Sequence, residues 1–349
     1  MQYDIIEYNK KKKGENRMFL VIDGSSLLVT NYFATLPPAL KFEKDPIKQA
    51  QLYPYLMQTS NGIYTNAIVG TLRTILSILA TRPDIDKLAI VFDKTRNTFR
   101  RTIYSEYKAN RKPTAKPLSE QFITIEHILS ELGLCVLYDD TYEADDLAGS
   151  IINKFKSTND MIFLTKDHDY LQLIDTNVTG WILQSSTEKA NAIMNGHNID
   201  TTNIPDKVAI FNNDIVLQEE KVNAIQIIDK KALCGDASDN IPGVPRVGES
   251  SVIPLLSHYK TIEDIYTDID SKPEKELVAF WKSNLGIKTS PYKKLVEYKD
   301  LAFMSKKLAT IVTNAPVPDD INTYNCIINK NKLAAIIDTY ELNSLKKFL

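Results

Sequence analysis

The chain has 349 residues, of which 43% are apolar and 25% charged, with a formal net charge of −2. This composition is that of a globular protein, and no apolar run approaches the roughly 20 residues that a membrane-spanning helix needs. The N-terminus carries charges but no apolar core, which excludes a secretory signal. Cys135, Cys234 and Cys326 are odd in number and widely spaced. They exclude a disulfide framework and a zinc site, and they predict reduced thiols in the cytoplasm.

The first third of the chain begins with a charged segment and a buried strand. Residues 1–17, with four consecutive lysines, predict a solvated tail, and a weak nucleic-acid-binding arm is the alternative. Met18–Ile22 is a continuous apolar run, typical of a buried parallel strand, and a helix is expected from there through Tyr32. Residues 37–60 contain four prolines and no clear period, so a loop is predicted.

Helical and strand-like patterns then alternate. Helices are predicted at Thr65–Leu79, Leu118–Leu132 and Tyr142–Phe155, and strands at Lys87–Phe92, Leu134–Leu137, Asp160–Leu164 and Val178–Leu183. This alternation indicates an α/β fold with a mostly parallel central sheet covered by helices. The Asn-rich stretch 185–220 has no clear period. Beyond residue 214 the pattern turns helical, most clearly at Val222–Leu233 and Gly248–Tyr259. Two parts are therefore expected, an α/β core at 18–213 and a helical part at 214–349.

Acidic residues follow the carboxyl ends of four predicted strands: Asp23, Asp93, Glu143, Asp145, Asp146, Asp167 and Asp169. Ligand sites of open α/β sheets form at this edge, so we expect the seven to converge. Singly, each is an ordinary turn residue or helix cap. Together they need cations or protonation, because two carboxylates about 4 Å apart repel by about 4 kcal/mol at an effective dielectric of about 20. Oxygen ligands without His or Cys favour Mg²⁺ or Mn²⁺ over zinc.

Two segments have the character of phosphate-binding elements. Lys94–Lys116 holds eight basic residues against one acid and includes three aromatic residues, a composition that suits phosphate contacts and base stacking. Its alternative interpretation is a solvated charged loop. Gly235–His258 has glycines for close backbone approach and a helix start that presents free N–H groups. Its alternative is a plain Gly/Pro turn between helices. The overall charge of −2 excludes neither, because the distribution of charge matters more than its sum.

Six motifs, in this order, resemble the 5′-nuclease family: FLVIDGSSLL, AIVFDK, FRRTIYSEYKANRK, YEADDLA, LTKDHDYLQL and GDASDNIPGVPRVGE. That family includes the 5′→3′ exonuclease domain of bacterial DNA polymerase I, phage flap endonucleases and stand-alone bacterial relatives. The resemblance runs from about Met18 to the C-terminus. It implies a PIN-like α/β core, a helical arch at about 94–131 and a helix-three-turn-helix at about 235–258.

The resemblance also implies two divalent ions, Mg²⁺ or in its place Mn²⁺. One position matches Asp23, Asp93, Glu143 and Asp145, and the other matches, directly or through water, Asp146, Asp167, Asp169, Asp236 and Asp239. In such a site one ion lowers the pKa of the attacking water and both stabilise charge on the phosphodiester. Lys108 and Arg111 match arch residues that contact the scissile phosphate, so the expected catalytic set is Asp93, Asp145, Lys108 and Arg111.

Residues expected to contact DNA follow from the same resemblance: Arg100, Tyr104, Lys108, Arg111, Lys112, Gly243, Arg246 and Gly248. Backbone carbonyls of the helix-three-turn-helix often hold K⁺ in relatives. This chain departs from the family at Glu249-Ser250-Ser251, where relatives commonly carry Lys after the Glu. Arg246 is then the expected local phosphate contact. His168 is treated as a variable neighbour of the acids rather than a general base.

The expected function is structure-selective 5′→3′ exonuclease and flap endonuclease cleavage of DNA in replication or repair. We expect a monomer without a polymerase region, in the cytoplasm of a bacterium or of a phage-infected host. Two alternatives stay open. One is a nuclease acting mainly on RNA, in RNA–DNA hybrids or as in the smaller PIN-domain ribonucleases. The other is a non-catalytic binder of branched DNA, against which the complete set of nine acids argues.

Overall fold

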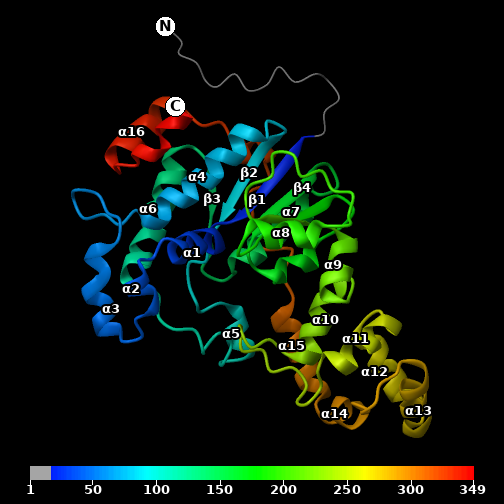
Figure 1. The fold of residues 1–349 in the computed structure, drawn as a ribbon. Coiled ribbons are helices and arrows are strands. Elements are labelled where there is room, and N and C mark those ends of the chain that lie inside the picture. The colour runs from blue at the N-terminus through cyan, green and yellow to red at the C-terminus, as the bar shows by residue number, and fades with distance from the viewer. Residues whose placement is uncertain (1–16) are drawn as a thin grey trace.

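The computed structural model describes residues 17–349 (Figure 1). The predicted tail therefore lies, apart from Arg17, outside the described residues. The centre of the fold is a six-stranded sheet with the order β3-β2-β1-β4-β5-β6. Its strands are β1 (Met18–Asp23), β2 (Ile85–Val91), β3 (Cys135–Leu137), β4 (Asp160–Thr165), β5 (Val178–Leu183) and β6 (Val208–Phe211). Only β6 is antiparallel to its neighbour, so the predicted mostly parallel sheet is confirmed.

Alternating residues of β1 supply two cores. Leu20 and Ile22 lie in a core with the helices α1 (Gly24–Ala34), α4 (Asn66–Thr81) and α6 (Lys116–Glu131). Phe19 and Val21 lie in a second core with α7 (Ala144–Phe155) and α8 (Thr187–Met194). Both faces of the sheet are thus covered, which is why its strands are continuous apolar runs.

The helical part shares the second core with α7 rather than forming a core of its own. Its helices are α9 (Asn213–Glu220), α10 (Ile227–Cys234), α11 (Glu249–His258), α12 (Ile262–Ser271), α13 (Glu274–Asn284), α14 (Tyr292–Glu297) and α15 (Lys299–Ala309). These elements extend away from the sheet in Figure 1. The buried Trp281 donates its indole N–H to the hydroxyl of Tyr259, so this tryptophan is a packing residue.

The predicted loop at 37–60 is wrong in part, because it holds α2 (Pro38–Phe42), α3 (Pro46–Leu52) and the 3₁₀ turn η1 (Tyr53–Tyr55). Proline is compatible with the first turn of a helix, and Asp45 caps α3 by accepting a hydrogen bond from the N–H of Ile47. The stretch 185–220, which has no clear period, contains α8, β6 and α9.

Two segments lie elsewhere than the sequence indicates. The residues after 330, predicted within the helical part, form α16 (Lys330–Thr339) and the 3₁₀ turn η5 (Asn343–Phe348), which pack on the core beside α4. Within the predicted arch, α6 buries Ile125 and Ile128 in the core beside the sheet, which leaves residues 94–115, with α5 (Phe99–Ile103), as the portion outside that core. Within residues 17–349, no helix combines the length and apolarity that a bilayer-spanning helix requires.

Candidate active site

An open cleft of about 620 Å³ lies at the carboxyl edge of the parallel strands. Its walls include five of the predicted acids, Asp23, Asp93, Glu143, Asp145 and Asp167, and two of the predicted cations, Lys108 and Arg111. The acids reach one cleft because β1, β2, β3 and β4 are neighbours that end at the same edge. The predicted convergence of carboxylates is therefore present for these five residues.

Asp23 ends β1 and starts α1. One carboxylate oxygen accepts a hydrogen bond from the N–H of Ser26 at 2.8 Å, and the other accepts from the hydroxyl of Thr165 at 2.7 Å. Burial, with the charge of Asp93 nearby, raises the pKa of Asp23 to about 7. A carboxylate held so firmly and so poorly solvated favours a bound cation.

Asp93 and Asp145 meet at the N-terminus of α7. The N–H of Ala144 donates to Asp93 at 2.9 Å, which ties the end of β2 to the first turn of that helix. The Oδ1 atom of Asp145 is buried and has no hydrogen-bond partner in the part of the chain that the structure describes. Burial raises the pKa of Asp145 well above its ordinary value, and Arg100 offsets only part of this effect. An unpartnered buried carboxylate oxygen facing a cleft is a candidate metal ligand.

Lys108 and Arg111 reach the acids from the loop 104–115. The ammonium group of Lys108 contacts Glu143 and lies 3.5 Å from Asp239, and Arg111 donates to Asp239 at 2.5 Å. Lys108 lowers the pKa of Glu143 despite its burial. The hydroxyl of Tyr107 donates to Asp239 at 3.1 Å. The predicted catalytic cations therefore contact two of the predicted metal-binding acids.

Asp169 and Asp236 form a neighbouring acidic pair. Asp169 lies in the 3₁₀ turn η2 (His168–Leu173), which Asp167 caps by accepting from the N–H of Asp169 at 2.9 Å. Lys231 on α10 contacts the carboxylates of both Asp169 and Asp236. Distant segments supply these basic partners, as they do for Glu143 and Asp239, which Lys108 and Arg111 contact.

Two predicted site residues are instead partners in the interior. Asp146 is fully buried, and its two carboxylate oxygens accept hydrogen bonds from Arg100 at 2.7 Å each. Arg100 is only 1% exposed and also donates to the carbonyl of Leu308. Arg100 cannot contact DNA from this position, so that prediction is wrong. Asp146, with both oxygens bound, lies apart from the cleft and supports the N-terminus of α7 through the N–H of Glu143.

The other predicted DNA contacts fall into two groups. Gly243 is buried with a φ of 60°, and its N–H donates to the hydroxyl of Ser305. Close packing against Gly235 explains why a glycine is present. The prediction of a DNA contact at Gly243 is therefore wrong. Tyr104 is half-buried against a small apolar cluster. The second group is exposed and can contact a ligand: Lys112, Arg246 and Gly248. Gly248 is the N-cap of α11.

The donor set of the cleft fits hard divalent cations, because every acid in it offers oxygen and none of the described residues that line it is a His or Cys. The unpartnered oxygen of Asp145 and the raised pKa of Asp23 favour the same ligand. As the side chains of residues 17–349 stand, no three His, Cys, Asp or Glu groups are close enough to hold a metal ion. The ammonium groups of Lys108 and Lys231 lie between the acids instead.

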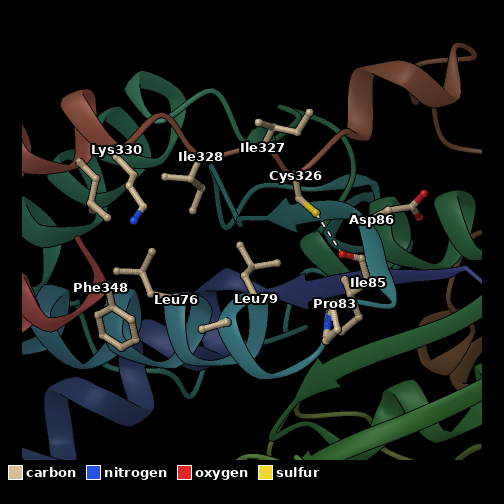
Figure 2. Close-up of a pocket in the computed structure, with 12 residues that line it drawn as sticks. Leu76, Leu79, Pro83, Ile85, Asp86, Cys326, Ile327, Ile328, Lys330 and Phe348 are labelled. Carbon is tan, nitrogen blue, oxygen red and sulfur yellow. Dashed lines mark hydrogen bonds between the residues drawn. The ribbon is translucent and has the colours of Figure 1, made fainter. Parts of the chain in front are cut away.

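A second hollow lies among β2, α4 and the C-terminal residues. Figure 2 shows it lined mainly by apolar side chains such as Leu76, Ile328 and Phe348, with the Cys326 thiol near the carbonyl of Ile85. It lies at the amino end of β2, opposite the acids, and Asp86 and Lys330 are the charged side chains among the described residues that line it. It offers no group for hydrolysis, so the acidic cleft is the candidate active site.

Sequence reasoning missed Lys231 and Tyr170. Tyr170 lines the cleft, and its buried hydroxyl has no hydrogen-bond partner among residues 17–349. Burial raises the pKa of this hydroxyl well above 10. Lys231 lies on α10, and Asp236 follows it five residues later, just beyond the end of that helix. The side chain of Lys231 points from α10 toward Asp169. The sequence does not reveal this contact, because the contact depends on where the turn after β4 lies in the fold.

Comparison with known proteins agrees with this architecture. The family described as "5'-3' exonuclease, N-terminal resolvase-like domain" matches residues 18–204, and "5'-3' exonuclease, C-terminal SAM fold" matches residues 222–332. The chain belongs to the 5′-3′ exonuclease family. A 5′-3′ exonuclease of Buchnera aphidicola subsp. Baizongia pistaciae is 31% identical over 310 residues, covering 87% of this chain and 84% of the relative.

Members of the 5′-3′ exonuclease family also occur as parts of longer proteins. DNA polymerase I of Caldicellulosiruptor bescii is 35% identical over 334 residues, which is 95% of this chain and 33% of the polymerase. The chain thus spans about a third of the polymerases that it matches.

Among solved structures, T5 5′-exonuclease with bound zinc has a TM-score of 0.54 at 18% identity, covering 95% of this chain and 97% of that chain. The catalytic core of Rad2 in complex with DNA substrate has a TM-score of 0.52 at 14% identity, covering 96% and 92%. These two likenesses show a shared fold.

Proposed function

We propose that the chain is a Mg²⁺-dependent 5′ nuclease that cleaves DNA as a 5′→3′ exonuclease and flap endonuclease. The observation that carries the proposal is the cleft itself, where the unpartnered oxygen of Asp145 lies with Asp23 and Asp93 beside Lys108 and Arg111. Carboxylates for cations and basic groups for phosphate share one opening. This combination suits hydrolysis of a phosphodiester.

Asp23, Asp93, Glu143 and Asp145 would hold one divalent ion, and Asp167, Asp169, Asp236 and Asp239 would serve a second. Asp146 is left out of the inferred ligands because Arg100 engages both of its oxygens. When bound, such ions lower the pKa of an attacking water and offset the negative charge of the phosphodiester. Mn²⁺ is expected to substitute for Mg²⁺, since both favour oxygen ligands.

The protein's own groups would orient the substrate. Four basic residues line the cleft, so a phosphate that enters meets positive charge. They are Lys94, Arg96, Lys108 and Arg111. No Ser, Cys or Thr is needed as a nucleophile. Tyr107, buried between Glu143 and Asp239, would hold the two carboxylates apart. The expected products carry a 5′-phosphate and a 3′-hydroxyl.

A second contact would hold the duplex away from the cut. Arg246 and Gly248 are exposed in the turn that leads into α11, where backbone N–H groups are free for a phosphate. We infer that residues 235–258 act as a helix-three-turn-helix, with K⁺ as a further ligand of that turn. The bacterial relatives, named DNA polymerase I and 5′-3′ exonuclease, support a role in DNA replication or repair in the cytoplasm. We expect the protein to act as a monomer.

The test uses a 5′-labelled DNA flap, a nicked duplex and the matched substrate in which the 5′ strand is RNA. We expect cleavage near the junction of the DNA flap with Mg²⁺ and none with EDTA. Preferential cleavage of the RNA strand would favour a hybrid nuclease instead. Tight binding of the flap without cleavage in either Mg²⁺ or Mn²⁺ would contradict the proposal and identify a branched-DNA binder.

A further inference from the structure

We propose that Lys231 and Lys108 are resident counter-ions of the active site, which compete with divalent cations for the same carboxylates. The inference rests on the proposed function, because it concerns the acids assigned there to metal ions. Its consequence is that cation binding frees ammonium groups at the cleft, where they become available to a phosphate.

The first contact is between Lys231 and the acidic pair Asp169 and Asp236, which joins the turn after β4 to the helical part. Its ammonium group contacts Asp169 and lies 2.6 Å from an oxygen of Asp236. The side chains are only 19%, 12% and 14% exposed, so water replaces little of this contact. Asp236 keeps one oxygen for Ser238, which donates from both its N–H and its hydroxyl at 2.8 Å. Lys231 occupies the other oxygen of Asp236.

The second contact is at the other end of the acidic group. Lys108 contacts Glu143 and lies 3.5 Å from Asp239, and Arg111 bonds the second oxygen of Asp239. The loop is also fastened by its backbone, because the N–H of Lys108 donates to the carbonyl of Asp239 at 2.9 Å. Lys108 has a φ of 53°, a conformation that costs a non-glycine residue energy. The surrounding contacts therefore hold this lysine over the acids.

Competition follows from the geometry. A carboxylate oxygen that holds an ammonium group at hydrogen-bond distance is a weaker ligand for a divalent ion, because the ammonium occupies one of its lone pairs and the two cations repel each other. Binding of a divalent ion therefore favours displacement of the lysine from the shared oxygen. Because such coupling is reciprocal, a phosphate that draws the lysine away must in turn strengthen cation binding. Metal and DNA then bind cooperatively through two side chains of this chain.

The chain offers a matched control beside Lys231. Lys230 precedes it on α10 and is 15% exposed, but it pairs with Glu220 at 3.1 Å and with Glu249 at 2.9 Å. Neither of these glutamates is among the acids assigned to metal ions. Replacing Lys230 removes the same charge from the same helix without uncovering Asp169 or Asp236.

The experiment measures Mn²⁺ binding by electron paramagnetic resonance for the full chain without DNA. Lys231→Met is expected to bind Mn²⁺ about tenfold more tightly than wild type at one site, because the competing ammonium group is removed. Lys230→Met should stay within about twofold. Melting in EDTA and in excess Mn²⁺ gives a second readout. Lys231→Met should melt below wild type in EDTA, because two acids lose their partner, and should regain that difference with Mn²⁺.

Lys108→Met provides an independent variant at the other contact, with the exposed Lys112→Met as its control. Unchanged Mn²⁺ affinity in both Lys231→Met and Lys108→Met would overturn the inference while leaving the nuclease proposal intact. A wild-type chain that binds no Mn²⁺ at all would instead contradict the proposed function, and the inference with it. Tighter binding in either variant, without a change in its control, supports resident counter-ions.

Discussion

Arg100 binds both carboxylate oxygens of Asp146 at 2.7 Å, although the two side chains are 1% and 0% exposed. The same guanidinium donates to the carbonyls of Leu308 and Thr310, and Asp146 accepts from the N–H of Val312. The pair therefore joins α5 and α7 to the end of α15. Its role is to position the first turn of α7, from which Glu143 and Asp145 face the cleft.

Breaking this pair on one side should be costly. We expect Arg100→Met to lower the free energy of unfolding by about 3–5 kcal/mol, because Asp146 keeps an unpaired charge in the interior. The double variant Arg100→Met with Asp146→Leu should lose less than the single variant, since no charge is left behind. Urea denaturation measures both. If the double variant loses as much stability as Arg100→Met or more, the two residues do not act as a unit.

Asp23 predicts a pH dependence of stability. Its pKa of about 7 in the folded protein lies above the ordinary 3.8, so the folded state binds more protons than the unfolded chain between these values. The free energy of unfolding contributed by Asp23 therefore falls as the pH rises through this window. Asp23→Asn should be more stable than wild type at pH 8 by about 2–4 kcal/mol and nearly equal to it at pH 4. Melting in EDTA at both values checks this, and parallel pH profiles of the two proteins would contradict it.

Gly243 and Gly248 form a matched pair for the turn before α11. A Cβ at Gly243 would lie 2.2 Å from the backbone nitrogen of Gly235, and the residue has a φ of 60°. Gly243→Ala should therefore cost about 2–4 kcal/mol of folding stability. A Cβ at Gly248 meets nothing within 4 Å, so Gly248→Ala should cost about 1 kcal/mol or less. Chemical denaturation of the two variants compares them, and a reversed order would show that this backbone can relax.

Arg246 predicts a change in DNA affinity without a change in stability. Its side chain is exposed in the same turn and makes no ion pair within the described residues. If it meets a phosphate, Arg246→Ala should reduce by about one the slope of log affinity against log salt for a duplex substrate. Fluorescence anisotropy over a salt series gives the slope, and the melting temperature serves as its control. An unchanged slope would remove Arg246 from the DNA-binding surface.

Much of the fold could be predicted because its strands are buried on both faces. Continuous apolar runs such as Met18–Ile22 identify such strands, and the acids that follow them then fall on one edge. The short α2 and α3 could not be recognised in this way. Of their residues, Leu40 alone is buried, so neither helix leaves a periodic apolar pattern.

The contacts among charged residues were harder to predict, because they join distant parts of the chain. Arg100 meets Asp146 across 46 residues and the carbonyl of Leu308 across 208, and Lys231 meets Asp169 across 62. A basic residue next to aromatics has the same pattern whether it faces DNA or the interior. The packing of α15 against α5 and α10 places Arg100 in the interior, whereas Lys108 reaches the cleft.

The most direct test of the central proposal compares wild type with Asp145→Asn on a 5′-labelled DNA flap in Mg²⁺. The substitution removes one ligand charge and leaves the side chain's size unchanged, and the buried Asp145 has a raised pKa, so folding should not suffer. We predict that cleavage falls by at least about 100-fold, equivalent to about 2.7 kcal/mol, while flap binding in Ca²⁺ is retained. Cleavage by Asp145→Asn at the wild-type rate would contradict a metal-dependent nuclease centred on this cleft.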